Sequence, residues 1–141
     1  MARPVEVIER WWALLETGEL DRLVEVTTAD ADIVMPGGMR FTGPVELRPM
    51  LEAYRRAFPT MRHRVVCAVE EGNMAAVELR VDVEHSGEFV TPMGSIPASG
   101  NRFVIESCDV VRVTDDGRIA SWHTYLDMAT MMSNMGVVAP A

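Results

Sequence analysis

The chain has 141 residues, of which 48% are apolar, and it carries 13 basic against 21 acidic residues for a net charge of -8. This length and apolar content support a single domain, spanning residues 1–141, with a hydrophobic core of its own. A nucleic-acid partner is not expected, because the acidic excess repels a phosphate backbone. No run of about 18 apolar residues and no signal peptide is visible, so we expect a cytoplasmic protein that does not bind membranes.

The first half of the chain has the apolar spacing of helices, with one short strand. A helix is expected to end at Gly18, a second short helix to follow at residues 20–24, and a strand to span residues 31–35. A further helix is expected to begin near Arg48, because Pro49 cannot donate a hydrogen bond to the preceding turn. Helices therefore dominate this half.

The second half alternates apolar and polar residues in the manner of antiparallel strands. The strands are expected at residues 61–70, 74–85, 102–114 and 118–126. A loop is expected at residues 91–100, and a short Met-rich helix at residues 128–135. Helices followed by a meander of antiparallel strands indicate an α+β fold.

Strand parity divides the ionisable residues between the two faces of the predicted sheet, because alternate side chains point in opposite directions. Asp109 falls on a mainly apolar face, where a carboxylate is costly unless it is hydrogen-bonded or neutral. His85 shares the apolar face of its strand, whereas Arg80 and Asp82 lie on the other face. Arg80 and Asp82 could equally belong to a solvated outer face with ordinary ion pairs.

The last predicted strand ends in polar and aromatic residues. His123, Tyr125 and Asp127 are expected to share one face, which makes them candidates to line a pocket. Asp127 directly precedes the Met-rich segment, where it could instead cap a helix. Met131 in that segment is either ordinary core or a lining that adapts to an irregular apolar ligand.

Aromatic residues of the predicted helices complete the candidate binding set. Trp12 lies on the first helix, and Tyr54 and Phe58 lie on the apolar stripe of the later one. The residues that we expect to contact substrate are Trp12, Tyr54, Phe58, His123, Tyr125 and Met131.

Several stretches resemble SnoaL-like proteins of the nuclear transport factor 2-like superfamily. They read WWALLETGELD at residues 11–21, HSGEF and IPASG within residues 85–100, and DGRI and WHTYLD within residues 116–127. The resemblance extends over residues 5–136. It implies a cone-shaped, strongly curved, mainly antiparallel sheet, packed on the N-terminal helices around one apolar pocket, and a homodimer.

In the polyketide cyclases of that family, a late aspartate and a histidine do acid–base work in ring closure. Asp127 and His85 match those positions. The resemblance therefore implies an enzyme of secondary metabolism that cyclises or isomerises a small apolar, polyketide-like substrate, with Asp127 as the principal acid or base. No metal or organic cofactor is expected.

The chain also resembles limonene epoxide hydrolases, whose catalytic set is an Arg-x-Asp on a central strand and an aspartate ending the last strand. Arg80, Asp82 and Asp127 fit that spacing. Two carboxylates beside one guanidinium can take different pKa values and so act as base and acid. This resemblance implies epoxide hydrolysis or epoxide-opening cyclisation. The chain departs from it at Asp32 and Val34, where that family positions its water with Tyr and Asn.

A third comparison is with ketosteroid isomerases. Asp109 matches their protonated oxyanion-hole aspartate, whereas Met35 and Trp11 stand in place of the general base and the tyrosine. Isomerisation by that mechanism is therefore not expected. A non-catalytic carrier of hydrophobic ligands stays open as an alternative to each of these enzymes.

Overall fold

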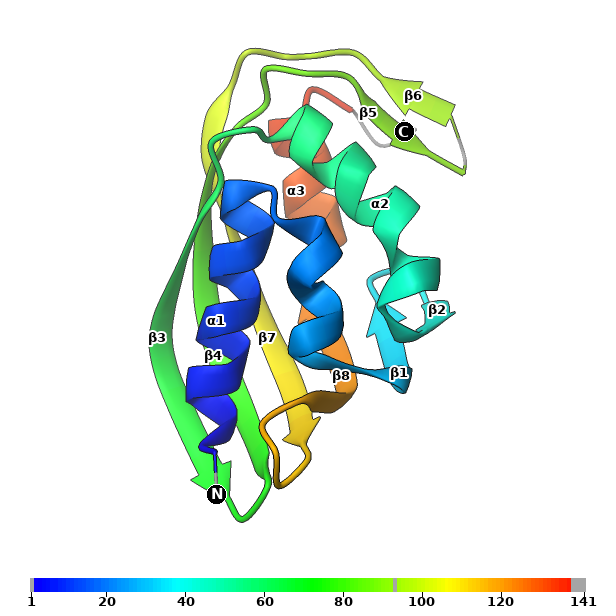
Figure 1. Cartoon of the computed structure of the whole chain (residues 1–141). Helices are drawn as coiled ribbons and strands as arrows, with labels where there is room; N and C mark the ends of the chain where they lie inside the picture. The colour runs from blue at the N-terminus through cyan, green and yellow to red at the C-terminus, as the bar shows by residue number, and fades with distance from the viewer. Residues whose placement is uncertain (1, 93, 138–141) are drawn as a thin grey trace.

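Helices lie on one face of a large sheet in the computed structural model, which describes residues 2–92 and 94–137 (Figure 1). The helices on this face are α1 (Pro4–Thr17), the 3-10 helix η1 (Leu20–Glu25) and α2 (Gly43–Ala57). A third α-helix, α3 (Met128–Asn134), follows the last strand. Helices at the start of the chain and a sheet formed mainly by the second half confirm the expected α+β class.

The large sheet has the strand order β2-β1-β8-β7-β4-β3. The strands are β1 (Thr27–Met35), β2 (Met39–Thr42), β3 (Arg62–Glu71), β4 (Met74–Glu84), β7 (Arg102–Val113) and β8 (Ile119–Leu126). Every neighbouring pair is antiparallel except β1 and β8, which run parallel. A separate ladder pairs β5 (Phe89–Thr91) with β6 (Gly94–Ile96). We call residues 86–92 and 94–100, which contain this ladder, the hairpin segment.

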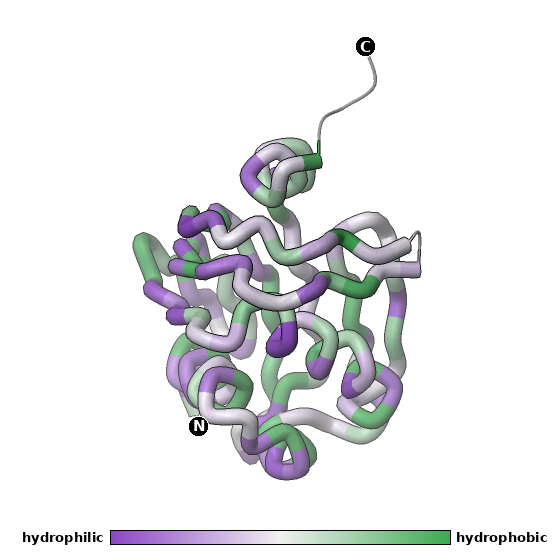
Figure 2. Tube along the Cα trace, turned by 90° about the horizontal axis from the view of Figure 1, so that it is seen from above, coloured by the Kyte–Doolittle hydropathy of each residue, from purple (hydrophilic) through white to green (hydrophobic). Residues whose placement is uncertain are grey.

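The core lies between the helices and the inner face of the sheet. Along β4, alternate residues from Ala75 to Val83 are buried. The largest fully buried side chains include Trp11, Phe58, Ile8 and Leu23. Met131 of α3 and Met135, which follows α3, join the same cluster, although α3 lies on the side of the molecule away from the N-terminus (Figure 2). Burying each large apolar side chain stabilises the fold by about 1.5–3 kcal/mol.

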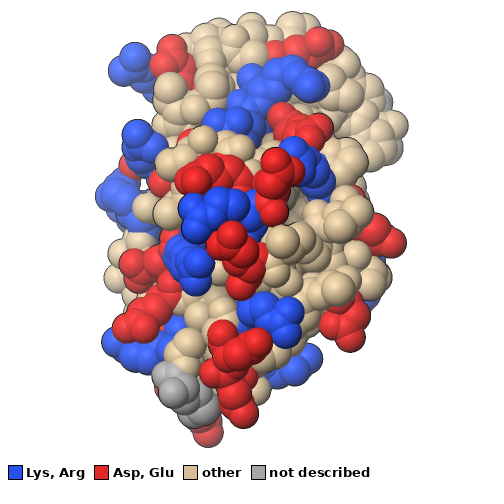
Figure 3. Space-filling model, in the orientation of Figure 1, with Lys and Arg blue, Asp and Glu red and all other residues tan. Residues whose placement is uncertain are grey.

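The helical face is a surface of mixed charge. Acidic and basic side chains are interspersed across it (Figure 3). On α2, for example, Arg48 Nε lies 2.9 Å from the Glu52 Oε1 atom one turn along the helix. Within the described ranges, no helix is both long enough and apolar enough to cross a lipid bilayer.

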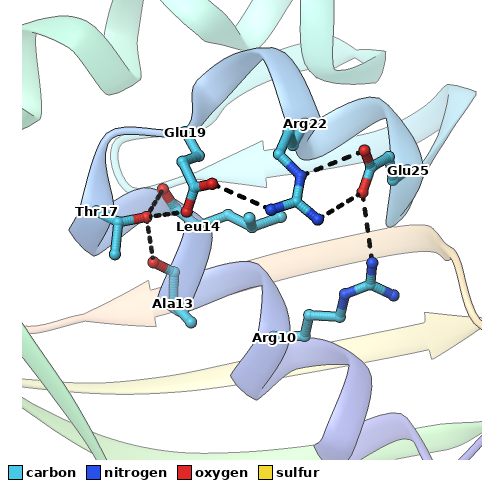
Figure 4. Close-up of polar contacts among 7 residues, drawn as sticks. All are labelled: Arg10, Ala13, Leu14, Thr17, Glu19, Arg22 and Glu25. Carbon is cyan, nitrogen blue, oxygen red and sulfur yellow. Dashed lines mark hydrogen bonds and ion pairs between the residues drawn. The ribbon is translucent and has the colours of Figure 1, made fainter.

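A polar network joins α1 to η1 on this face (Figure 4). Arg22 donates to Glu19 at 3.0 Å and to Glu25 at 3.2 Å, and Arg10 reaches Glu25 at 3.4 Å. The Thr17 hydroxyl also donates to Glu19, and this bond together with Arg22 lowers the pKa of Glu19. Because these side chains are about half-exposed, each pair adds little stability and the network mainly fixes the turn between the helices.

The start of α2 differs from the prediction. The helix begins at Gly43, well before the expected start near Arg48, and Pro49 lies inside it. Pro49 cannot donate to the Val45 carbonyl, but Val45 is 78% exposed, so water can take that carbonyl. The missing bond therefore costs less than it would in a buried turn.

Several strands are longer than predicted or were not predicted. β1 begins at Thr27 rather than at residue 31, and β2 pairs with it after the turn at residues 36–38. The ladder of β5 and β6 occupies part of the loop expected at residues 91–100. Short strands of this kind depend on pairing with partner strands rather than on local pattern, which is why the sequence did not indicate them.

The face predicted for the last strand is wrong. A register shift in the β7–β8 pairing lets Ile119 and Trp122 both be buried, although they are an odd number of residues apart. Beyond the shift, Thr124 lies on the inner face with Trp122, while His123 and Tyr125 lie on the outer face. Tyr125 is accordingly 58% exposed.

Candidate functional site

Two ionisable side chains are buried in the described part of the chain. Among its Asp, Glu, Arg and His residues, only Asp109 (1% exposed) and His85 (0%) are buried. They are not neighbours: Val77 of β4 pairs with Asp109, and His85 lies eight residues further along the chain. A straight strand would separate them by roughly 26 Å at about 3.3 Å per residue. Asp109 and His85 are therefore two separate buried polar groups on the inner face of the sheet.

Asp109 lies on the inner face of β7, as its parity predicted. The Thr124 hydroxyl on the neighbouring strand β8 donates to the Oδ1 atom of Asp109. Burial raises the pKa of Asp109 to about 7, against the opposing effects of Thr124 and the Trp122 indole. Near neutral pH this carboxyl group can therefore be either a proton acceptor or a proton donor.

Trp122 lies beside Asp109 and packs against Trp11 of α1. The rings of Trp11 and Trp122 meet edge to face with centroids 4.2 Å apart. Trp11 Nε1 donates to Thr27 Oγ1 at 3.1 Å. Trp122 Nε1 is buried and makes no hydrogen bond of standard geometry to the residues described, although its indole lies close enough to lower the pKa of Asp109. The Trp122 N–H is thus a donor without a full partner next to a buried carboxyl group.

Tyr54 of α2 connects Asp109 to a group of aromatic rings. Burial and the negative charge of Asp109 both raise the pKa of Tyr54, so its phenol stays neutral. Its ring lies 5.1 Å from that of Phe58, which also contacts Phe89 at 5.7 Å and Phe103 at 6.0 Å. We call Tyr54, Phe58, Phe89 and Phe103 the aromatic cluster. Two of its members, Tyr54 and Phe58, were predicted as binding residues, and Met131 is buried in the same core.

His85 lies at the far end of this cluster. Its ring centroid is 5.5 Å from that of Phe58. Its Nδ1 atom lies 2.9 Å from Ser99 Oγ in the hairpin segment. Burial lowers the pKa of His85, so the ring is neutral near pH 7.

Asp127 lies outside this interior. The side chain is exposed and caps α3, accepting from the Thr130 N–H at 3.0 Å and from its hydroxyl at 2.6 Å. These bonds lower the pKa of Asp127. A carboxylate with a lowered pKa is a poor proton carrier near neutral pH, so the geometry corresponds to the helix-cap alternative.

Arg80 and Asp82 lie on the outer face of β4, since the β4–β7 ladder has no bulge that would turn them inward. Asp82 accepts two bonds from Arg64, at 2.8 and 3.1 Å, and Arg64 lowers its pKa. Arg80 Nε lies 3.6 Å from Glu106 instead. The Arg80, Asp82 and Asp127 set expected from the epoxide hydrolase resemblance is therefore not assembled.

Three predicted binding residues lie away from the aromatic cluster. His123 Nε2 is 2.9 Å from Asp32 Oδ2 on the outer face, and Tyr125 is exposed there. Trp12 stacks on His63 of β3, with centroids 5.1 Å apart and planes 7° from parallel. Of the two tryptophans on α1, Trp11 rather than Trp12 packs against Trp122, whose indole lies near Asp109. Helical spacing alone does not make this distinction.

Two hollows of the described surface are not lined by Asp109 or His85, although the larger one shares Phe103 with the aromatic cluster. One, of about 570 Å³, is lined by Thr60, Asp82, Val83, Glu84, Arg102, Phe103 and Val104. Another, of about 190 Å³, lies between α1 and β3 beside Trp12 and His63. Neither corresponds to the single apolar pocket that was expected. The described residues contain no group of three His, Cys, Asp or Glu side chains placed to hold a metal ion.

The SnoaL-like domain family matches residues 8–122, from α1 into β8. The chain belongs to the SnoaL-like domain family. The match confirms the resemblance to SnoaL-like proteins that the sequence motifs of this chain indicate. No curated protein matches it.

Solved structures of SnoaL-like proteins share the fold of this chain. A protein from Jannaschia sp. CCS1, assigned as a SnoaL-like polyketide cyclase, has a TM-score of 0.82 at 17% identity, with 96% of this chain and 93% of that one covered. IdmH from Streptomyces antibioticus, assigned as a polyketide cyclase, has a TM-score of 0.79 at 26% identity, with 96% and 100% covered. An NTF2-like protein of unknown function from Burkholderia pseudomallei K96243 has a TM-score of 0.76 at 14% identity, with 97% and 100% covered. The chain thus has the NTF2-like fold.

Proposed function

We propose that this SnoaL-like chain is an enzyme without an organic cofactor that cyclises or isomerises an apolar, polyketide-like substrate, with Asp109 as its acid and base. One observation carries the proposal: the buried carboxyl group on the inner face has a pKa raised to about 7. A group of this kind exchanges protons most effectively near neutral pH. The likeness to IdmH, a protein assigned as a polyketide cyclase, supports the same class of reaction.

The proposed chemistry begins with the Asp109 carboxylate removing a proton from a carbon next to a carbonyl group. The resulting enolate carbon attacks a second carbonyl of the same molecule, so that a carbon–carbon bond forms and an alkoxide results. Asp109, now protonated, returns the proton to that alkoxide. The neutral Tyr54 hydroxyl and the Trp122 N–H are the donors proposed to stabilise the enolate oxygen.

Substrate must reach a carboxyl group that is only 1% exposed. The route that we propose passes along the aromatic cluster, beneath the hairpin segment and α3. Both are short elements, and Met131 of α3 and Met135 just after it contribute adaptable side chains. Opening of such elements on the microsecond to millisecond timescale is a common way to admit substrate.

Deuterium exchange tests the proton-transfer role directly. The probe is 2-tetralone, a bicyclic apolar ketone with acidic carbon-bound protons, incubated with the protein in heavy water and followed by NMR. The native protein should accelerate exchange, with a rate that rises through about pH 7 as Asp109 ionises. Asp109→Asn should lose at least about 100-fold of this acceleration.

The matched control is Asp82→Asn, which removes a carboxylate from the outer face and should leave exchange unchanged. Equal exchange by Asp109→Asn and native protein would overturn the proposal. Binding of 2-tetralone without any acceleration of exchange at any pH would instead favour the carrier of hydrophobic ligands.

A further inference from the structure

His85 is held rigidly at the base of the hairpin segment. Its backbone N–H donates to the Asn101 carbonyl, and its carbonyl accepts from the Gly100 N–H, both at 2.9 Å. The Gly87 N–H bonds to the Ala57 carbonyl at 3.2 Å, which ties the segment to the end of α2. The imidazole therefore has a fixed position relative to the aromatic cluster.

Ser99 determines which ring nitrogen of His85 carries the proton. The Ser99 backbone N–H donates to Nδ1 at 3.3 Å, and the Ser99 hydroxyl lies 2.9 Å from the same atom. Because an amide N–H can only donate, Nδ1 must accept. A neutral imidazole then carries its hydrogen on Nε2.

The Nε2 atom is buried and has no hydrogen-bond partner among the described residues. The Gly87 backbone lies near enough to oppose the lowering of the pKa of His85, but it does not reach hydrogen-bond geometry with Nε2. Burying an N–H without a partner is costly, so such a group calls for a functional explanation, such as a ligand that accepts from it. Nε2 lies on the side of the ring away from Ser99, in a ring that contacts Phe58.

We propose that the His85 Nε2–H is a specificity-determining donor, which binds a carbonyl or phenolic oxygen of a planar, apolar ligand stacked against the aromatic cluster. This deepens the proposed function and rests on it, because a polyketide-like substrate carries such oxygens. His85 is a positioning residue here and moves no proton. It fixes one end of the ligand, while the reacting carbons lie toward Asp109.

The test compares two rigid tricyclic probes of the same shape. Fluorenone carries one carbonyl oxygen and fluorene carries none, and fluorenone has no proton next to its carbonyl that Asp109 could remove. Calorimetry of the native protein at pH 8 should show a fluorenone preference that falls about tenfold in His85→Phe. Asp109→Asn should keep the full preference, which separates this binding role from the proton transfer tested above.

Nitrogen-15 NMR on the native protein provides a second measurement that does not depend on the folding of a variant. The Nε2–H tautomer should be present without ligand, and its signal should shift when fluorenone is added but not when fluorene is added. His85→Gln, which restores an amide donor, should recover part of the fluorenone preference. An Nδ1–H tautomer, or an unchanged preference in a folded His85→Phe protein, would overturn the proposal whether or not Asp109 transfers protons.

Discussion

Asp109 should make the stability of the fold depend on pH in an unusual direction. An unfolded aspartate has a pKa near 3.9, whereas burial raises the pKa of Asp109 to about 7. Between these values the folded state holds a proton that the unfolded state has released. The free energy of unfolding therefore falls as pH rises through this window, by on the order of 4 kcal/mol in total, and then levels off.

Asp109→Asn should remove most of this pH dependence. At pH 8 the variant should be more stable than the native protein by up to about 4 kcal/mol, less the loss of the Thr124 bond, and near pH 4 the two should converge. Urea unfolding at a series of pH values measures both curves. A native stability that stays flat or rises between pH 4 and 7 would contradict the placement of a neutral carboxyl group at this position.

At the scale of single elements, α3 depends on its capping aspartate. Asp127→Ala removes both bonds to Thr130 and should cost about 1 kcal/mol, seen as faster amide hydrogen exchange within Met128–Asn134. Asp127→Asn keeps a capping oxygen and should behave like the native protein. This holds both for the amide exchange of α3 and for the deuterium exchange of 2-tetralone. If Asp127→Asn kept α3 intact but no longer accelerated the deuterium exchange of 2-tetralone, Asp127 would again be a candidate acid or base.

The hairpin segment depends on the absence of a side chain at Gly87. A Cβ at this position would lie 1.9 Å from the Arg56 carbonyl oxygen, which is part of the backbone of α2. Gly87→Ala should therefore displace the base of the segment and cost about 1–3 kcal/mol. Thermal unfolding should show the loss, while the neighbouring exposed change Ser86→Ala should be close to neutral. If Gly87→Ala unfolded at the same temperature as the native protein, contacts other than the one at Gly87 would hold the hairpin segment in place.

Local patterns predicted the elements whose periodicity is simple. The helix ending at Gly18 and the alternating strand before His85 appear as expected, and Asp109 lies on the apolar face that parity assigned to it. The candidate site was predicted less well, because it depends on pairing between distant strands. The bulge in β8 places Trp122 on the inner face and Tyr125 on the outer face, and the pattern of one strand contains no such information.

For the whole molecule, the outer face of the sheet remains as the expected surface for a homodimer. It exposes Val66, Val104 and Tyr125 among its charged residues. Tyr125→Arg should place a charge in this surface and convert a dimer to a monomer in sedimentation experiments, with the fold unchanged by circular dichroism. The matched change Val45→Arg, on the exposed side of α2, should leave the assembly state unaltered. Identical sedimentation of native protein and Tyr125→Arg would assign any dimer to another surface.

The position of β8 has a consequence for how the chain comes to be folded in a cell. This strand is the last of the large sheet in sequence, yet it lies between β1 and β7 and, among the described strands, it alone joins them. While a ribosome is still adding the residues before Ile119, β1 with β2 and β3 with β4 and β7 are two pieces of sheet with open edges. The nascent chain cannot close its core until its final strand has emerged. Protection of those edges against pairing with other chains must therefore come from rapid completion or from chaperones.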